Sequence, residues 1–303
     1  MINVPGLPDG LTARPPTLDD IDEVVALCRA EQVRSGVAAH TNAADFTSEW
    51  QRPSMDLDLD AVVVQEGPRI VGYADQSDGR AWVAVDPSAE GHGIGTALRR
   101  WTEANARHHG LPRIGQTLPR TATEAMSLLA DAGWTARWDT WVFSIPLGPD
   151  LPPPHLPDGV VVRSIKRPDE ERAAYDVVQA AFGEWPDRDS SQTFEDWRAE
   201  NLDRDDADAD LLLVAVEDDR VVGAALCLED EDEGWVAELA VPREHRGRGL
   251  GRGLLESAFQ RFAARGRLTA GLSTDSRTGA RTLYEHVGMT VTEDWARWAL
   301  DLD

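Results

Sequence analysis

The spacing of hydrophobic and polar residues in the second half of the chain predicts ten secondary-structure elements. Alternation with a period of two predicts strands at residues 160–165, 211–216, 220–226, 235–241, 268–273 and 295–300. Apolar positions three and four residues apart predict helices at residues 169–182, 193–201, 251–265 and 278–286, with Asp169 as a helix cap. Residues 217–219 are typical of a hairpin turn.

The order of these elements is β-α-α-β-β-β-α-β-α-β, and the first half follows the same order with a poorer second helix. This order predicts an α/β fold of the mixed α+β kind. We expect a mostly antiparallel mixed sheet with helices on both faces in each half, and not a doubly wound parallel sheet.

The two halves of the chain share sequence segments in the same order, which indicates a duplicated domain. The matching pairs are Leu7–Gly10 with Leu156–Gly159, Val85–Gly95 with Val241–Gly251, and Ala125–Trp134 with Ala280–Met289. A proline-rich segment lies between the copies, and its prolines favour an extended, stiff spacer. We therefore predict one domain at residues 1–147, a linker at residues 148–157 and a second domain at residues 158–303.

The amino-acid composition and the net charge exclude several classes of protein. The 303 residues fit two domains, each long enough to bury its own core. The net charge of −24 excludes a nucleic-acid partner, which needs a basic face, and is suited to a cationic substrate. There is no secretory signal and no apolar run of about 18 residues, so we expect a cytoplasmic protein without membrane contact. Cys28 and Cys227 are expected to be buried thiols. Monomer and homodimer are both left open.

The strongest chemical motif is a glycine- and arginine-rich loop between a strand and a helix. Glycines in Arg246–Arg252 allow backbone N–H groups to turn inward, and the helix N-terminus adds its positive end, so a diphosphate can bind. The arginines give this loop a positive electrostatic potential in an otherwise acidic chain. Neither the Rossmann nor the Walker pattern fits. The first copy keeps Gly91, Gly93 and Gly95, which predicts either a non-catalytic CoA loop or a role in the fold alone.

The loop resembles the acyl-CoA loop of the GNAT superfamily of N-acyltransferases, and Ala280–Met289 resembles the next block of that superfamily. Two such domains in one chain resemble the tandem acetyltransferases related to mycothiol synthase. The resemblance implies acetyl-CoA as co-substrate and no metal. The residues that it assigns to CoA are Leu239, Ala240 and Val241 beside the pantetheine arm, and Arg246, Gly247, Arg248, Gly249, Leu250, Gly251 and Arg252 around the pyrophosphate.

Acetyl transfer from a thioester to an amine needs a base, an oxyanion donor and an acid for the departing thiolate. The resemblance gives the acid role to Tyr284 and the oxyanion role to a main-chain N–H near Leu239. Glu238 is the candidate base, although alternation turns it away from Leu239, so a solvent-exposed role is an alternative. Asp275 and a water relay to a more distant carboxylate are further candidates for the base.

The first copy lacks these groups, since it has Leu129, Glu90 and Trp82 where the second copy has Tyr284, Arg246 and Glu238. Trp185 and Trp235 are the residues expected to line the acceptor pocket.

These observations predict that the second domain transfers acetyl directly to a primary amine of a small molecule, without a covalent enzyme intermediate. The first domain is expected to be degenerate. One alternative is a non-catalytic acyl-CoA-binding or regulatory module. Others keep the enzyme and change the acceptor, to a protein amine or a cysteinyl glycoside.

Overall fold

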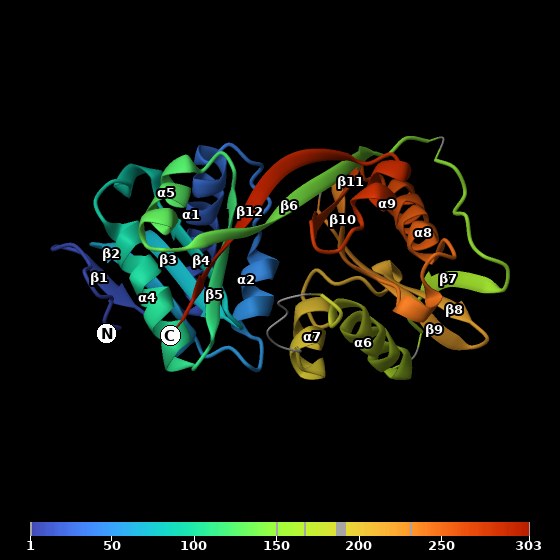
Figure 1. Cartoon of the computed structure of the whole chain (residues 1–303), viewed down its shortest axis with the longest axis horizontal. Helices are drawn as coiled ribbons and strands as arrows, with labels where there is room; N and C mark the ends of the chain where they lie inside the picture. The colour runs from blue at the N-terminus through green and yellow to red at the C-terminus, as the bar shows by residue number, and fades with distance from the viewer. Residues whose placement is uncertain (1, 150, 167, 186–191, 231, 303) are drawn as a thin grey trace. The chain divides into compact units, whose positions relative to one another are not determined.

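The computed structural model describes residues 2–149, 151–166, 168–185, 192–230 and 232–302, and it divides the chain into two compact units (Figure 1). Unit 1 consists of Met1–Asp139 and Trp295–Asp303, and unit 2 consists of Thr140–Asp294. Each unit has a sheet in which one neighbouring pair of strands is parallel and the others are antiparallel.

In unit 1 the strands lie in the order β1-β2-β3-β4-β5-β12. The strands are β1 (Thr12–Arg14), β2 (Ala61–Glu66), β3 (Arg69–Ser77), β4 (Arg80–Val85), β5 (Arg113–Pro119) and β12 (Thr290–Asp301). The helices are α1 (Ile21–Arg34), α2 (Ala43–Trp50), α3 (Leu57–Asp60), α4 (Ile94–His108) and α5 (Thr123–Asp131). One apolar cluster packs α1 and α2 on one face of the sheet, and another packs α4 on the opposite face.

In unit 2 the strands lie in the corresponding order β7-β8-β9-β10-β11-β6. The strands are β6 (Thr135–Pro146), β7 (Val160–Ser164), β8 (Leu212–Glu217), β9 (Arg220–Glu229), β10 (Glu233–Ala240) and β11 (Thr269–Asp275). The helices are α6 (Pro168–Phe182), α7 (Phe194–Asn201), α8 (Leu250–Ala264) and α9 (Arg281–His286). Helices α6 and α7 cover one face, and α8 and α9 cover the other. The mixed sheet with helices on both faces is confirmed.

Local sequence chemistry accounts for several boundaries. Asp218 and Asp219 connect β8 to β9 with positive φ angles of 48° and 60°, which acidic side chains tolerate in a two-residue hairpin turn. The Thr193 hydroxyl accepts from the Asp196 N–H and caps α7. The expectation for Asp169 was wrong, because α6 already begins at Pro168 and Asp169 lies in its first turn. Proline suits that position, since the first helical N–H needs no partner within the helix.

The last strand of each sequence copy completes the sheet of the other unit. Strand β6 pairs with β11, so that Phe143 lies opposite Leu272, and β12 pairs with β5, so that Ala299 lies opposite Gly115. Figure 1 shows both long strands running out of one unit and into the other. The compact units therefore differ from the sequence domains at residues 1–147 and 158–303. Alternation predicts a strand but not its neighbour, so two similar last strands fit either sheet equally well.

The proline-rich segment between the copies packs against α8 and is not a free spacer. The Gln260 side-chain amide donates to the Leu151 carbonyl at 3.0 Å, and the His155 N–H donates to Glu256 at 2.7 Å. A Cβ at Gly253 would come within 2.5 Å of the Leu156 side chain, so the close approach requires glycine there. The segment is thereby fixed beside the helix that follows the glycine-rich loop.

Both cysteines are buried free thiols, as expected, and burial raises the pKa of Cys28 and Cys227. In the part of the chain that the structure describes, no helix combines the length and apolar character that a membrane span requires.

The strand exchange makes a testable prediction. Ala299→Asp places a charge in a buried position of β12, and Phe143→Ala removes a fully buried side chain from β6, at a cost of about 3–5 kcal/mol for the latter. Hydrogen exchange measured by mass spectrometry should accelerate first at residues 61–119 in Ala299→Asp and first at residues 212–275 in Phe143→Ala. The reverse assignment of the two variants would show that each copy keeps its own last strand.

Unit 1 also contains a buried hydrogen-bonded chain of three side chains. Trp50 Nε1 donates to the Tyr73 hydroxyl at 3.0 Å, which donates to Asp75 Oδ2 at 2.6 Å. Burial raises the pKa of Asp75 to about 7, although the bond from Tyr73 opposes the shift. The folded chain therefore keeps this carboxyl protonated at pH values where the unfolded chain ionises it.

This raised pKa predicts that Asp75 lowers the free energy of unfolding progressively between about pH 4 and pH 7, because only the unfolded state has released its proton there. Asp75→Asn should therefore gain stability relative to the wild type as the pH rises from 5 to 8. Urea denaturation at the two pH values measures the effect. Equal pH dependence of the two proteins would contradict the assignment.

Candidate active site

The central feature of unit 2 is the point at which β10 and β11 separate. Their parallel pairing ends at Val236 and Leu272. Beyond that point β10 continues along β9 to Ala240, while β11 continues along β6 to Asp275. The two strands thus leave an opening between them, with backbone N–H and C=O groups along its edges.

A β-bulge at Ala237 lies at the start of this opening. Val236 pairs with Cys227 and Glu238 with Leu226, so Ala237 is an extra residue on β10. The bulge reverses the two faces of the strand. Val236 packs in the α8 cluster, whereas Ala240 packs with α6 and α7, although strict alternation would place both on one face.

The bulge determines the surroundings of the candidate base, Glu238. Its carboxylate lies on the α6–α7 face, where Trp197 Nε1 donates to Oε2 at 2.9 Å. Glu238 is half-buried, with part of its surface open to solvent. Leu239 and Val241 pack on the opposite, α8 face, so Glu238 turns away from both of them, as alternation predicted. Trp197, which is fully buried, is a partner that the sequence analysis did not identify.

The glycine-rich loop joins β10 to α8, which begins at Leu250. Gly247 and Gly249 have φ angles of 73° and 89°, and Gly249 is the N-cap. These left-handed conformations favour glycine and turn successive N–H groups toward one side. Gly91 and Gly93 of the first copy have nearly the same angles, 77° and 89°, so the loop conformation is kept in both units.

The loop arginines in unit 2 form ion pairs with carboxylates. Arg248 contacts Glu217 at 2.9 Å and holds the pKa of that carboxyl below its ordinary value. Arg246 contacts Glu184 at 2.8 Å, and its Nε also donates to the Val241 carbonyl. All four groups are partly exposed, so the pairs are weak and an anionic ligand can replace the carboxylates.

The third loop arginine, Arg252, contacts Glu256 at 2.7 Å. Glu256 also accepts from the His155 N–H, and although burial opposes the effect, these bonds leave its pKa below the ordinary value. Unlike the other two, this pair links the loop to the proline-rich segment.

Tyr284 lies on α9 and is buried, with its ring centroid 5.5 Å from that of Phe143. Burial raises its pKa to about 12, a hydrogen bond with Thr274 opposes the shift, and the charge of Asp275 adds to it. Thr274 is on β11, two residues beyond its last pair with β10. Tyr284 is part of the apolar cluster that packs α8 and α9 on the sheet. Phe143 and Thr274 carried no sequence signal of a role.

The two tryptophans expected to line the acceptor pocket lie at different places. The Trp185 ring stacks on Phe182 at 4.3 Å, and the Arg277 guanidinium lies 5.7 Å from its centre. The Trp235 ring lies over Gly271 of β11, where a Cβ would come within 2.8 Å of it. Trp235 thus packs across the paired part of the two strands.

Asp275, the other carboxylate considered as a base, accepts from the Arg277 guanidinium at 2.6 Å.

Unit 1 keeps the opening and the loop but not the reactive groups. Strands β4 and β5 pair only at Arg80 and Gly115. Leu129 is buried at the position of Tyr284, and Glu90 contacts Arg34 at 3.5 Å. Trp82 stacks on Phe46, as part of the aromatic core.

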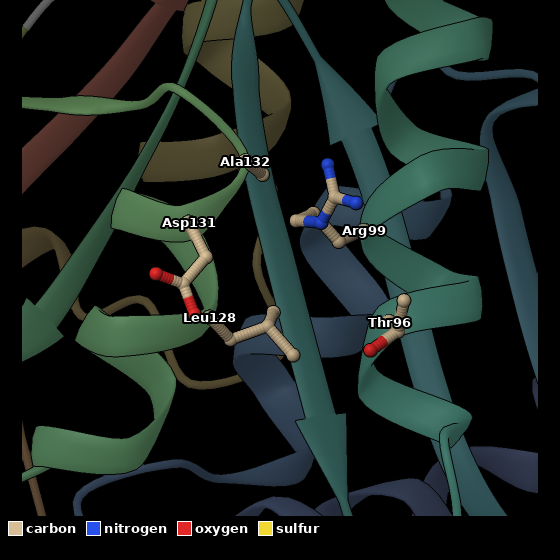
Figure 2. A pocket seen from close by; sticks show the side chains of 5 residues that line it. All are labelled: Thr96, Arg99, Leu128, Asp131 and Ala132. Carbon is tan, nitrogen blue, oxygen red and sulfur yellow. The ribbon is translucent and has the colours of Figure 1, made fainter.

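A hollow lies beside this loop in unit 1, between α4 and α5. Figure 2 shows its lining residues, Thr96 and Arg99 from α4 and Leu128, Asp131 and Ala132 from the end of α5.

Comparison with known proteins also indicates a duplicated domain. Residues 29–133 and 172–289 both match the acetyltransferase (GNAT) family. The mycothiol acetyltransferase of Thermomonospora curvata is 29% identical over 299 residues, covering 97% of this chain and 94% of that protein. A GCN5-related N-acetyltransferase from Sphaerobacter thermophilus is 31% identical, with a TM-score of 0.76 over 97% of this chain and 96% of that one. A tandem GNAT protein from the clavulanic acid biosynthesis pathway shares the fold, with a TM-score of 0.74 at 17% identity over 96% and 98% of the chains.

The family matches lie in the two segments that contain the glycine-rich loops and the helices that follow β5 and β11. The two matches together span most of the chain, and one match lies in each copy. Proteins of this fold take acyl-CoA as co-substrate. The chain belongs to the acetyltransferase (GNAT) family, as an acetyl-CoA-dependent acetyltransferase with two GNAT domains in tandem.

Proposed function

We propose that unit 2 transfers the acetyl group of acetyl-CoA directly to a primary amine of a small molecule, and that unit 1 is not catalytic. The observation that carries this proposal is the distribution of groups between the units. Both keep the opened strands, but only unit 2 combines them with loop arginines and a buried tyrosine on α9. Unit 1 has Glu90 and Leu129 in those places.

In this proposal the pantetheine arm lies in the opening, bonded to the backbone of Leu239, Ala240 and Val241. The pyrophosphate takes the N–H groups of residues 247–252, where the helix N-terminus favours negative charge. Arg246 and Arg248 then exchange their carboxylate partners for phosphate oxygens. The glycine loop of unit 1 has Glu90 in place of Arg246, so the proposal expects weaker CoA binding there or none.

The proposed chemistry uses groups on both sides of the opening. Glu238, held at Oε2 by Trp197, takes the proton that the attacking amine must lose. A backbone N–H beyond the Ala237 bulge stabilises the tetrahedral oxyanion. Tyr284 donates to the departing thiolate. Neither loop motif contains a cysteine, which supports direct transfer without a covalent enzyme intermediate.

The acceptor is proposed as a small cationic amine, supported by the net charge of −24. A cysteinyl glycoside is a second candidate, favoured because the similar protein from Thermomonospora curvata is a mycothiol acetyltransferase. Thiol release from acetyl-CoA can be measured with a panel of polyamines, aminoglycosides, amino sugars and cysteinyl glycosides, and this panel separates the two candidate acceptors. Basic peptides in the same panel test protein amines as acceptors. Tight acetyl-CoA binding without turnover of any amine would favour a non-catalytic binding module instead.

The role of Tyr284 predicts that Tyr284→Phe lowers kcat by about 10²-fold, since loss of a general acid costs that much. The variant keeps the ring that packs on Phe143, so the KM for acetyl-CoA and the melting temperature should stay within about twofold and a few degrees of wild type. Steady-state thiol release with the best amine of the panel measures both constants. Unchanged kcat would remove Tyr284 from the chemistry.

The role of the second loop predicts that Arg246→Glu weakens acetyl-CoA binding roughly 10- to 100-fold, the effect of a lost charge-assisted hydrogen bond to phosphate. Glu90→Ala, the matched change in the first loop, should alter the affinity by less than about twofold. Isothermal titration with acetyl-CoA measures both affinities. Similar effects of the two variants would contradict the assignment of the working loop to unit 2.

A further inference from the structure

The carboxylate of Glu238 is bonded to a buried side chain of α7. Trp197 Nε1 donates to Oε2 of Glu238 at 2.9 Å. Trp197 is fully buried, whereas Glu238 is half-buried on β10, two residues beyond the last pair of β10 with β11 at Val236. An indole N–H can only donate, so the tryptophan is the donor whatever the other contacts of the carboxylate. The bond therefore joins the interior of unit 2 to the part of β10 that lies along the opening.

Aromatic neighbours fix the ring of Trp197. It stacks on the Phe194 ring with centroids 6.0 Å apart, and it meets the Tyr175 ring at 5.7 Å in an edge-to-face arrangement. The Tyr175 hydroxyl in turn donates to the Gln192 carbonyl at 2.6 Å. Side chains packed in this way occupy single rotamers. The fold thus sets the direction of the indole N–H independently of Glu238.

Strand pairing shows which residue of the first copy matches Glu238. Gly72 of β3 and Gly223 of β9 end the same repeated segment, residues 69–72 and 220–223. Three residues beyond Gly72 the cross-strand partner is Trp82, and three residues beyond Gly223 it is Glu238. Trp82 therefore occupies in unit 1 the position that Glu238 has in unit 2.

The helix caps show which residue matches Trp197. Asn42 caps α2 and Thr193 caps α7, each by accepting from the N–H three residues further on. The next residue is Phe46 in α2 and Trp197 in α7, and both are buried. In unit 1 Phe46 stacks on Trp82, with centroids 5.4 Å apart. Two rings thus pack together in unit 1 at the positions where unit 2 has an N–H donor and a carboxylate.

This difference indicates a role for the indole N–H beyond packing, since two stacked rings fill the same positions in unit 1. A donor to a carboxylate favours its ionised form, which is the form that a general base needs. A base also has to be held in one orientation toward the proton that it takes. A bond from a fixed indole to one carboxylate oxygen meets both requirements.

We propose that Trp197 is a positioning residue for the general base of unit 2: by donating to Oε2 it keeps Glu238 ionised and oriented to take the proton of the acceptor amine. This inference rests on the proposed function of unit 2. In the step, the amine nitrogen bonds to the acetyl carbonyl carbon and its proton passes to Glu238. The C–S bond breaks with its electron pair on sulfur, which takes the Tyr284 proton. Trp197 keeps its N–H throughout, and solvent returns the proton of Glu238 to Tyr284.

The first variant that tests the inference is Trp197→Phe, which introduces the residue of the first copy. We expect kcat to fall about tenfold, because the base loses its orientation, with the KM for acetyl-CoA within about twofold. The acid limb of kcat/KM for the amine should move to higher pH by about one pH unit, because the ionised carboxylate loses a donor. Thiol release with the best amine of the panel, measured from pH 5 to pH 9, gives these values. Loss of packing alone would lower kcat without moving the acid limb.

A double-mutant cycle with Glu238→Gln shows whether Trp197 acts through the carboxylate. Glu238→Gln should lower kcat about 10²-fold, as expected for a lost general base. In that background Trp197→Phe should cost less than about twofold. Trp50→Phe is the matched control, since it removes another buried indole N–H, which donates to the Tyr73 hydroxyl at 3.0 Å in unit 1. It should leave both kcat and the acid limb unchanged.

A spectroscopic measurement provides a readout that needs no acceptor. The chain has 11 tryptophans, so their indole ¹⁵N–¹H groups give a small set of NMR signals. The signal lost in Trp197→Phe belongs to Trp197, and Glu238→Ala should shift it because the acceptor is removed. Trp197→Tyr, which fills more of the space, gives the assignment if the phenylalanine variant does not fold.

The outcomes separate the inference from the proposed function. If Glu238→Gln leaves kcat unchanged, Glu238 is not the base and the inference fails with it, while Tyr284→Phe still tests acetyl transfer by unit 2. If Glu238→Gln slows turnover but Trp197→Phe leaves the acid limb unmoved, or costs the same in both backgrounds, only the inference about Trp197 is overturned. An unmoved Trp197 signal in Glu238→Ala also overturns it, since the hydrogen bond would then be absent in solution.

Discussion

The separation of β10 from β11 is the constraint on which the rest of the candidate site depends. Two adjacent parallel strands normally satisfy each other's backbone groups along their length. Here the ladder stops at Val236 and Leu272, and the bulge at Ala237 moves the next residues of β10 to new faces. Because of that shift, Glu238 lies beside Trp197 while Leu239 and Val241 pack with α8. Without the bulge, strict alternation would place Glu238 on the α8 face and Leu239 on the α6–α7 face.

The elements around the opening are held by residues from both copies of the sequence. Strand β6 belongs to the first copy, yet it pairs with β11 along the edge that faces away from β10. Its Phe143 supports the ring of Tyr284, and the proline-rich segment that follows fixes the start of α8. The first copy thus has a structural role in unit 2.

The charged side chains of the glycine-rich loop in unit 2 contribute little to the stability of the fold. The loop arginines are partly exposed and paired with carboxylates, so these ion pairs are weak. The buried Thr274 hydroxyl lies 3.0 Å from the Thr278 hydroxyl, which is its hydrogen-bond partner. Unit 1 differs in two ways: it has Leu129 in place of the Tyr284 side chain, and it has a buried carboxyl, Asp75, that accepts a hydrogen bond within its own core.

The sequence by itself determined the element order, the duplication, the glycine-rich loop and the loss of Tyr284 and Arg246 equivalents in the first copy. These features are local: they depend on periodicity, on backbone freedom at positions such as Gly249, and on residue identity at matched positions. Tertiary structure alone decided which sheet receives each last strand, where Glu238 points, and that Phe143 contacts Tyr284. The physical reason is that each of these depends on register. A single extra residue at Ala237 reverses the faces of β10, and two similar strands, β6 and β12, carry no local signal of which neighbour they pair with.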